Sequence, residues 1–222
     1  MSEGKHLPLV IIGGGGHASV LVDMLRQQQR RILAVISPDL IDRGEVFGEI
    51  KQLTSDEDIH QFGCDDIRLV NGLGMLPGQN LRRKVGEKFR ELGYRFETVI
   101  SSKAIVSPFA TLAEGVQVMP GTVVQAGSQI GQHSIINSGV IVEHDSQIGD
   151  WNHIAPGVTL CGHVSTGDDV FIGAGATVTQ MVCIGSGAIV GAGTTLTEEL
   201  AAHHICYPAK NTQQEIKPKV TL

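Results

Sequence analysis

The chain has 222 residues, of which 41% are hydrophobic, 18% charged and 4% aromatic, so it can form one large domain or two small ones built on small aliphatic side chains. The formal net charge of −6 argues against a nucleic-acid-binding face, because few basic residues are available to contact phosphates. Residues Met1 to Pro8 lack the apolar stretch of a signal peptide, no apolar run is long enough to span a membrane, and the four cysteines have no metal-ligand spacing. We therefore expect a cytoplasmic protein with reduced thiols.

The first 98 residues alternate between short apolar strands and amphipathic helices. We expect strands at 7–12, 32–36 and 67–70, and helices at 18–29 and 80–92, the second of which stops before Gly93. Alternating strands and helices predict a parallel sheet covered by helices. Because the segment is short, we expect a shortened Rossmann-like α/β domain over residues 1–98.

A glycine-rich segment, Gly13 to Ala18, joins the first expected strand to the first expected helix. Its G-x-G-x-x-A pattern in this position favours a phosphate site, because amides at the start of a helix can hold phosphate groups. The ends of the other two strands, at Ser37-Pro38-Asp39 and Asn71-Gly72, would complete a crevice at the same edge of the sheet.

From residue 100 onward the sequence repeats every six residues. The repeated position is aliphatic except at Thr166, and its members are Ile100, Val106, Leu112, Val118, Val124, Ile130, Ile136, Val142, Ile148, Ile154, Leu160, Thr166, Ile172, Val178, Ile184, Val190 and Leu196. Four positions after each of them stands a small or β-branched residue, with Asn152 as the exception. This period predicts a solenoid in which each hexad forms a short strand and a turn, with the aliphatic side chain inside. We expect a parallel β-helix over residues 99–198, followed by a C-terminal tail over 199–222.

These hexads, of the form [LIV]-G-x-x-[small]-x, resemble those of the left-handed parallel β-helix acyltransferases. Three further motifs make the chain similar to the NeuD/PglD-type sugar acyltransferases: the glycine-rich segment with His17, then Asn137 with Glu143-His144-Asp145, then Tyr207-Pro-Ala-Lys210. That family includes UDP-N-acetylbacillosamine and GDP-perosamine N-acetyltransferases. The resemblance implies a left-handed helix with three hexads per coil, acetyl-CoA as co-substrate, and a homotrimer with active sites between subunits. The remaining histidines lack convincing metal-ligand spacing, so we expect no catalytic metal.

Transfer of an acetyl group to an amine needs a base for the amine proton and stabilisation of the thioester oxygen. The resemblance identifies His144 as the base and Asp145, where the family commonly has Glu, as the residue that orients its ring; Glu143 is the other carboxylate that could do so. It also implies that His153 contacts acetyl-CoA. His153 lies half a coil from His144, so the two would meet only between subunits.

The resemblance also assigns binding roles along both halves of the chain. Gly162, one coil after His144, would leave room for the pantetheine arm, and the CoA groove would be lined by Gly173, Ala174, Gly191 and Ala192. Contacts with the nucleotide sugar would come from Gly15, Gly16, His17, Ser37, Asp39, Asn71, Gly72 and Asn137. The other histidines of the repeat and the following segment are expected to be turn or loop residues without a metal: His133, His163, His203 and His204.

Three functions are compatible with these features. The first is an acetyl-CoA-dependent N-acetyltransferase that acts on the amino group of a UDP- or GDP-linked 4-amino-deoxy sugar, for surface polysaccharide or glycan biosynthesis. The second is a sugar O-acetyltransferase of the sialic-acid type on the same scaffold, and the third is a non-catalytic solenoid. The nucleotide-binding domain favours the first, and the presence of Asn137, Glu143, His144, Asp145 and His153 in one chain disfavours the third.

Overall fold

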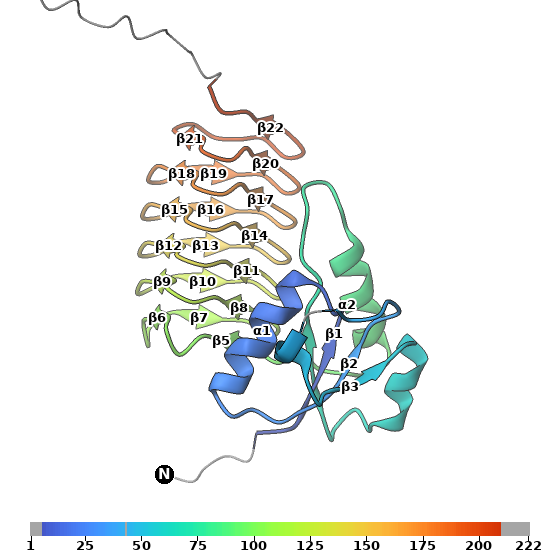
Figure 1. Ribbon diagram of the computed structural model, residues 1–222. Coiled ribbons are helices and arrows are strands. Elements are labelled where there is room, and N and C mark those ends of the chain that lie inside the picture. Colours follow the sequence, from blue (N-terminus) through green and yellow to red (C-terminus); the bar gives the residue numbers. More distant parts are fainter. Residues whose placement is uncertain (1–5, 43, 210–222) are drawn as a thin grey trace, which may run out of the picture.

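The computed structural model describes residues 6–42 and 44–209, which form an α/β domain beside a β-helix (Figure 1). The α/β domain contains the strands β1 (Leu9–Ile12), β2 (Ile32–Ile36), β3 (Lys51–Leu53) and β4 (Arg68–Asn71), the helices α1 (Gly16–Gln27) and α2 (Leu81–Glu91), and the 3₁₀ helices η1 (Gly44–Phe47) and η2 (Asp56–Gln61). The strands are parallel, in the order β3-β2-β1-β4. The motif that ends at Lys210 extends beyond the described residues.

The central strand β1 is buried along its whole length, as expected of a parallel strand covered on both faces. Helix α1 packs on the sheet through Ala18, Leu21, Val22, Met24 and Leu25, all of which are buried. The edge strand β3 was not expected, because only Leu53 among its residues is buried and the segment carries no apolar run. The α/β architecture predicted for this part of the chain is confirmed.

The β-helix is built from two-residue strands that stack into three parallel sheets (Figure 1). Its strands are β5 (Val99–Ile100), β6 (Ile105–Val106), β7 (Thr111–Leu112), β8 (Gln117–Val118), β9 (Val123–Val124), β10 (Gln129–Ile130), β11 (Ile135–Ile136), β12 (Ile141–Val142), β13 (Gln147–Ile148), β14 (His153–Ile154), β15 (Thr159–Leu160), β16 (Ser165–Thr166), β17 (Phe171–Ile172), β18 (Thr177–Val178), β19 (Cys183–Ile184), β20 (Ile189–Val190), β21 (Thr195–Leu196) and β22 (Ile205–Cys206). The sheet orders are β5-β8-β11-β14-β17-β20-β22, β6-β9-β12-β15-β18-β21 and β7-β10-β13-β16-β19.

Each coil uses three hexads, because strands pair with the third strand along the chain, as in Ile136 with Ile154. The repeated aliphatic residues form one continuous buried core from Val118 to Leu196. Ile100 is an exception at 39% exposure, because it lies in the terminal coil and no coil covers it from below. The last strand, β22, pairs with β20, so the helix continues past the boundary expected at residue 198.

In every hexad from residue 115 to residue 193, one corner position has a positive φ angle. Glycine occupies most of these positions, but other residues stand at six of them between residues 115 and 193: His133, Asp145, Trp151, His163, Asp169 and Met181. Positive φ is unfavourable for residues with a Cβ atom. The corners therefore mark places where a side chain stands despite a conformational cost.

The two parts of the chain join through a buried contact between α2 and the β-helix. The ring of Trp151 stacks on His133 with centroids 4.0 Å apart, and His133 meets the ring of Phe96 edge-on at 4.8 Å. Gly86 of α2 lies against Trp151, where a Cβ atom would collide with the indole. Arg83 pairs with Asp169 across the same junction. In the described part of the chain, no helix combines the length and apolar character that a membrane crossing requires.

Candidate functional site

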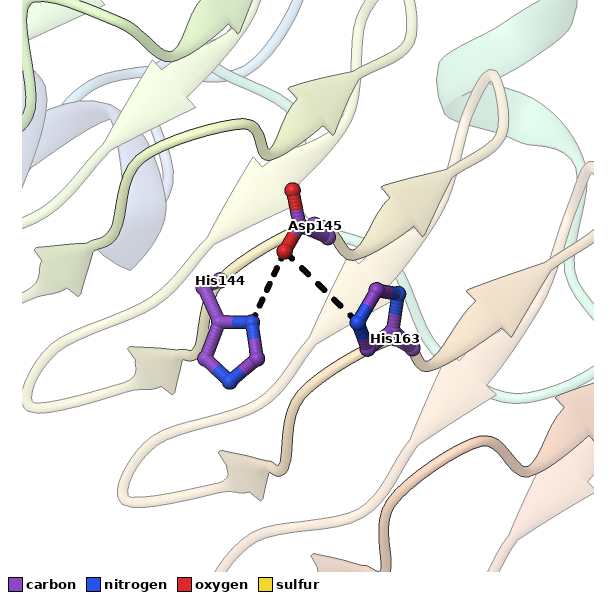
Figure 2. A group of neighbouring side chains, drawn as sticks. All are labelled: His144, Asp145 and His163. Carbon is purple, nitrogen blue, oxygen red and sulfur yellow. Dashed lines mark hydrogen bonds and ion pairs between the residues drawn. The ribbon is translucent and has the colours of Figure 1, made fainter.

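His144 and Asp145 lie at a corner of the β-helix between β12 and β13, and Figure 2 shows their side chains facing each other. The Nδ1 atom of His144 is 2.8 Å from Oδ2 of Asp145. An ionised carboxylate can only accept a hydrogen bond, so Nδ1 carries the proton and Nε2 keeps its lone pair. Both side chains are about half exposed. The pair therefore presents an oriented, unprotonated imidazole nitrogen at the surface.

Glu143 contributes backbone hydrogen bonds at this corner. Its amide donates to Leu160 O at 2.9 Å, and its carbonyl accepts from the Ser128 hydroxyl at 2.9 Å. Asp145 is the carboxylate in hydrogen-bond contact with the His144 ring. Of the two acidic residues that the sequence left open, the geometry thus favours Asp145 as the orienting one.

Gly162 lies one coil beyond His144 and faces its ring. A Cβ atom at this position would lie 2.7 Å from His144 Nε2, closer than a van der Waals contact allows. The space beside Gly162 is therefore occupied by the imidazole of the same chain. The sequence-based expectation that the glycine leaves room for a pantetheine arm stays a prediction.

His153 lies on a different wall of the coil, in β14, and is 8% exposed. Its Nδ1 is 3.1 Å from Met75 O, a carbonyl that can only accept, so Nδ1 bears the proton. Its Nε2 then accepts from Asn137 Nδ2 at 3.2 Å. Burial and the nearby Arg82 lower the pKa of His153 to about 4, which keeps the ring neutral. Within one chain, His144 lies at the corner between β12 and β13, whereas His153 lies in the third sheet, so the two are apart, as the sequence predicted.

A cavity of about 520 Å³ opens beside His153, between the loop before α2 and the wall of the β-helix. Met75 and Phe171 line it, and both contact His153, the latter with ring centroids 5.1 Å apart. Arg83 and Lys84 of α2 also line it, together with Glu87 and Asp169, which both pair with Arg83. The cavity therefore combines apolar side chains with two cationic and two acidic groups.

The glycine-rich loop places three expected residues at the start of α1. Gly15 is the N-cap residue, with open space where a Cβ atom would lie, and Gly16 begins the helix. His17 Nε2 is 2.7 Å from Oε1 of Gln117 in the β-helix. Burial and Arg82 lower the pKa of His17 to about 4. The exposed helix start is available to an anion, and His17 connects it to the β-helix.

The strand ends of the α/β domain show two different environments. The hydroxyl of buried Ser37 donates to the backbone oxygen of exposed Asp39 at 3.0 Å. Asn71 is 1% exposed, and its Nδ2 donates to Arg82 O while its Oδ1 accepts from Leu73 N. Its neighbour Gly72 packs so closely on α1 that a Cβ atom would lie 2.7 Å from Cβ of Ala18. Asn71 and Gly72 are therefore buried packing residues, and their side chains do not line the crevice that the sequence predicted.

The glycine and alanine residues expected in the CoA groove lie against one another in successive coils. A Cβ atom on buried Gly173 would collide with the backbone of Ala192 and would lie 2.9 Å from C of Gly191. Ala174 and Ala192 are exposed on the outer surface. The glycines permit close stacking, and the alanines leave a low, apolar surface beside them.

Four residues near the site were not identified from the sequence, namely His163, Gln117, Arg82 and Met75. His163 follows Asp145 by one full coil, and its Nε2 lies 3.6 Å from Asp145 Oδ2 (Figure 2). The coil period was a signal for this neighbour. Gln117, Arg82 and Met75 make contacts between the two domains, which no periodicity in the sequence could indicate.

Comparisons with known proteins agree on one group of enzymes. The family model for the bacterial transferase hexapeptide (six repeats) matches residues 127–162, and no sequence among the curated proteins matches the chain. The structure is similar to a histidine-to-asparagine variant of perosamine N-acetyltransferase from Caulobacter crescentus in complex with CoA and GDP-perosamine, with 34% identity, a TM-score of 0.81, and coverage of 93% of this chain and 97% of that one.

Two further solved structures share the architecture. The acetyltransferase domain of PglB from Neisseria gonorrhoeae, in complex with acetyl coenzyme A, is 26% identical with a TM-score of 0.83, and the match covers 93% of this chain and 100% of that one. WeeI from Acinetobacter baumannii, 24% identical with a TM-score of 0.77 over 90% of this chain and 95% of its own, agrees in fold. With a relative of 34% identity matched over nearly the full length of both chains, the protein belongs to the NeuD/PglD-type sugar acyltransferases, a family of left-handed β-helix, hexapeptide-repeat enzymes.

Proposed function

We propose that the protein is an N-acetyltransferase that moves the acetyl group of acetyl-CoA to the amino group of a nucleotide-linked 4-amino-deoxy sugar. The observation that carries this proposal is the His144–Asp145 pair, whose hydrogen bond leaves a basic nitrogen free at the surface. The glycine-rich start of α1 supports a nucleotide as the carrier of the sugar. The solved relatives are complexes with CoA and GDP-perosamine or with acetyl-CoA, which supports both substrates.

The reaction needs one group that accepts a proton and returns it. The amine nitrogen attacks the thioester carbonyl carbon while His144 Nε2 takes the amine proton, and Asp145 stabilises the imidazolium that forms. The C–S bond then breaks, and the same Nε2 proton is returned to the departing sulfur of CoA. The product is an acetamido sugar, and both acetyl carbon atoms are retained. A sugar hydroxyl could use the same base, but the nucleotide-binding loop favours the amino sugar.

A complete site would need a second copy of the chain. His144 lies at the corner between β12 and β13 and His153 lies in β14, so they are on different sides of one β-helix, and a closed homotrimer would bring His144 of one subunit near His153 of the next. The cavity beside His153, with Lys84 at its rim, would then hold the CoA. Both substrates are cytoplasmic metabolites, so we place the reaction in the cytoplasm, where it would supply surface polysaccharide or glycan assembly.

The reaction itself can be tested with purified protein, acetyl-CoA and a panel of UDP- and GDP-linked 4-amino sugars, with the acetamido product quantified by chromatography. We expect turnover with at least one amino sugar, and none with the matching 4-hydroxy sugars. His144→Ala should lower kcat by a factor of about 10² or more while the thermal melting temperature stays close to that of the wild type. Near-normal turnover in this variant would exclude His144 as the base.

The composite site can be tested by subunit complementation. His144→Ala and His153→Asn should each be inactive alone, because each lacks one half of every site. After unfolding and refolding together, the mixture should recover activity at those interfaces that pair two intact halves. Failure to recover any activity, with mixed oligomers demonstrated by mass spectrometry, would show that both histidines act within one chain.

A further inference from the structure

Three potential metal ligands meet at the catalytic corner of the β-helix. Figure 2 shows one nitrogen of His144 and one of His163 facing the same carboxylate oxygen of Asp145, and one ligand atom from each of the three residues lies within 4.8 Å of the other two. Asp145 Oδ2 is 2.8 Å from His144 Nδ1 and 3.6 Å from His163 Nε2. Asp145 and His163 occupy the same corner of successive coils, both with a φ angle of 58°. The stacking of coils therefore fixes their spacing.

The ligand set matches the preferences of zinc. Two imidazole nitrogens and one carboxylate oxygen are typical zinc ligands, bound at about 2.0–2.2 Å, which places neighbouring ligands of a tetrahedral ion about 3.4 Å apart. The two separations around Asp145 Oδ2 lie on either side of that value, so rotations of exposed side chains suffice to reach it. The side chains are 51–58% exposed, which leaves a fourth position for water.

We propose that this corner binds Zn²⁺, or a similar divalent transition-metal ion, and that the bound ion inhibits acetyl transfer. The inhibitory part rests on the proposed function, because it requires His144 to be the base. Without metal, the proton of His144 lies on Nδ1 and the lone pair on Nε2 is free. A metal on Nδ1 would leave the proton of the neutral ring on Nε2, the nitrogen that must receive the amine proton. His144 and Asp145 can therefore either form the hydrogen bond of the active site or bind a metal ion, but they cannot do both at once.

His163 allows metal binding to be separated from catalysis, because it contributes a ligand and has no part in the proposed proton transfer. Asn is the replacement of choice, since it tolerates a positive φ angle better than most residues. In calorimetry without substrates, we expect the wild type to bind one Zn²⁺ per chain and His163→Asn to bind it at least tenfold more weakly. In metal-free buffer, the variant should keep acetyl-transfer activity within about twofold of the wild type.

A matched control is available at the surface of η2. His60 is exposed and lies 3.5 Å from Glu57, a pair of donors without the third ligand found at the β-helix corner. His60→Asn should leave zinc affinity unchanged. Inhibition should be followed through the acetamido product, because the thiol of released CoA also binds zinc, and the inhibition constant should rise in His163→Asn by the same factor as the dissociation constant.

Cobalt provides a spectroscopic test of the ligands. Co²⁺ in the wild type should give the visible absorption of a tetrahedral nitrogen and oxygen site, without the near-ultraviolet band of cobalt–sulfur bonds, and His163→Asn should lose it. A sulfur band would overturn the proposal in favour of a cysteine such as exposed Cys183. Equal zinc affinity in the wild type and His163→Asn would overturn it as well. If the protein transfers no acetyl group, the proposed function fails, while calorimetry still decides whether the site exists.

Discussion

The corner residues of the β-helix show where a specific side chain replaces the glycine that the repeat favours. Glycine adopts positive φ at little cost, whereas other residues lose about 1–2 kcal/mol there. Five of the six residues other than glycine at these corners make a specific contact. His133 and Trp151 stack on each other, Asp145 contacts His144, His163 contacts Asp145, and Asp169 contacts Arg83. The strained corners thus coincide with the domain junction and with the candidate active site.

Asp145→Asn tests whether the carboxylate orients the catalytic imidazole. An amide lacks the charge that stabilises the imidazolium and can donate to Nδ1, which would move the ring proton to Nε2. We expect kcat to fall at least about tenfold with the fold intact, because Asn is compatible with the φ angle of 58°. Glu143→Gln is the matched control and should stay near wild-type activity in steady-state kinetics. The opposite ranking of the two variants would identify Glu143 as the orienting residue.

At the scale of the hexad, the sequence predicts the β-helix well because every coil repeats one burial pattern. The two exceptions in that pattern, Thr166 and Asn152, are explained only by the structure. Asn152 Nδ2 donates to the Thr166 hydroxyl at 2.5 Å, and its Oδ1 accepts from Val170 N at 2.6 Å. Each of the two polar side chains therefore satisfies a hydrogen-bonding group of the other within the β-helix. Such a pair has no sequence signature, because its members lie in different rows of the repeat.

For the candidate site, too, the sequence predicted the local motif but not the contacts between distant residues. His144 and Asp145 are neighbours in the chain and were identified from their motif, whereas the contact of Asp145 with His163 depends on the spacing between coils. Asn71 was expected at an open crevice, but the β-helix packs over it and Gln117 donates to its carbonyl at 2.8 Å. Contacts between the domains depend on how the α/β domain docks on the β-helix. Each domain has its own hydrophobic pattern, and neither pattern specifies the docking, so local sequence patterns did not reveal these contacts.

The spacing of coils also gives a test of Gly162. An added methyl group would lie 2.7 Å from His144 Nε2 and would displace the imidazole, so Gly162→Ala should lower kcat by at least about tenfold with a small change in KM for acetyl-CoA. If the glycine instead clears a path for pantetheine, KM should rise and kcat should hold. Steady-state kinetics with varied acetyl-CoA separate the two outcomes. A melting temperature close to that of the wild type would verify that the coil stacking is intact.

For the molecule as a whole, stability depends on keeping three histidines neutral where the domains meet. Burial is the main cause that lowers the pKa of His133 to about 3 and the pKa values of His17 and His153 to about 4, and positively charged Arg82 adds to the effect in each case. In the unfolded chain these rings titrate near pH 6.5. Their contribution is complete above that pH and is lost as pH falls from about 6.5 towards the folded values, because the unfolded state then binds more protons.

His133→Asn isolates one of these contributions. The variant loses the stack on Trp151, so we expect it to be about 2–4 kcal/mol less stable near neutral pH. Between about pH 7.5 and pH 5.5, one buried neutral histidine accounts for a loss of ~1.4 kcal/mol, so the unfolding free energy of the variant should fall by ~1.4 kcal/mol less than that of the wild type. Urea unfolding at both pH values and one fixed protein concentration measures this difference, with exposed His60→Asn expected to follow the wild type. Parallel acid sensitivity in His133→Asn and the wild type would mean that His133 does not couple protonation to the docking of the two domains.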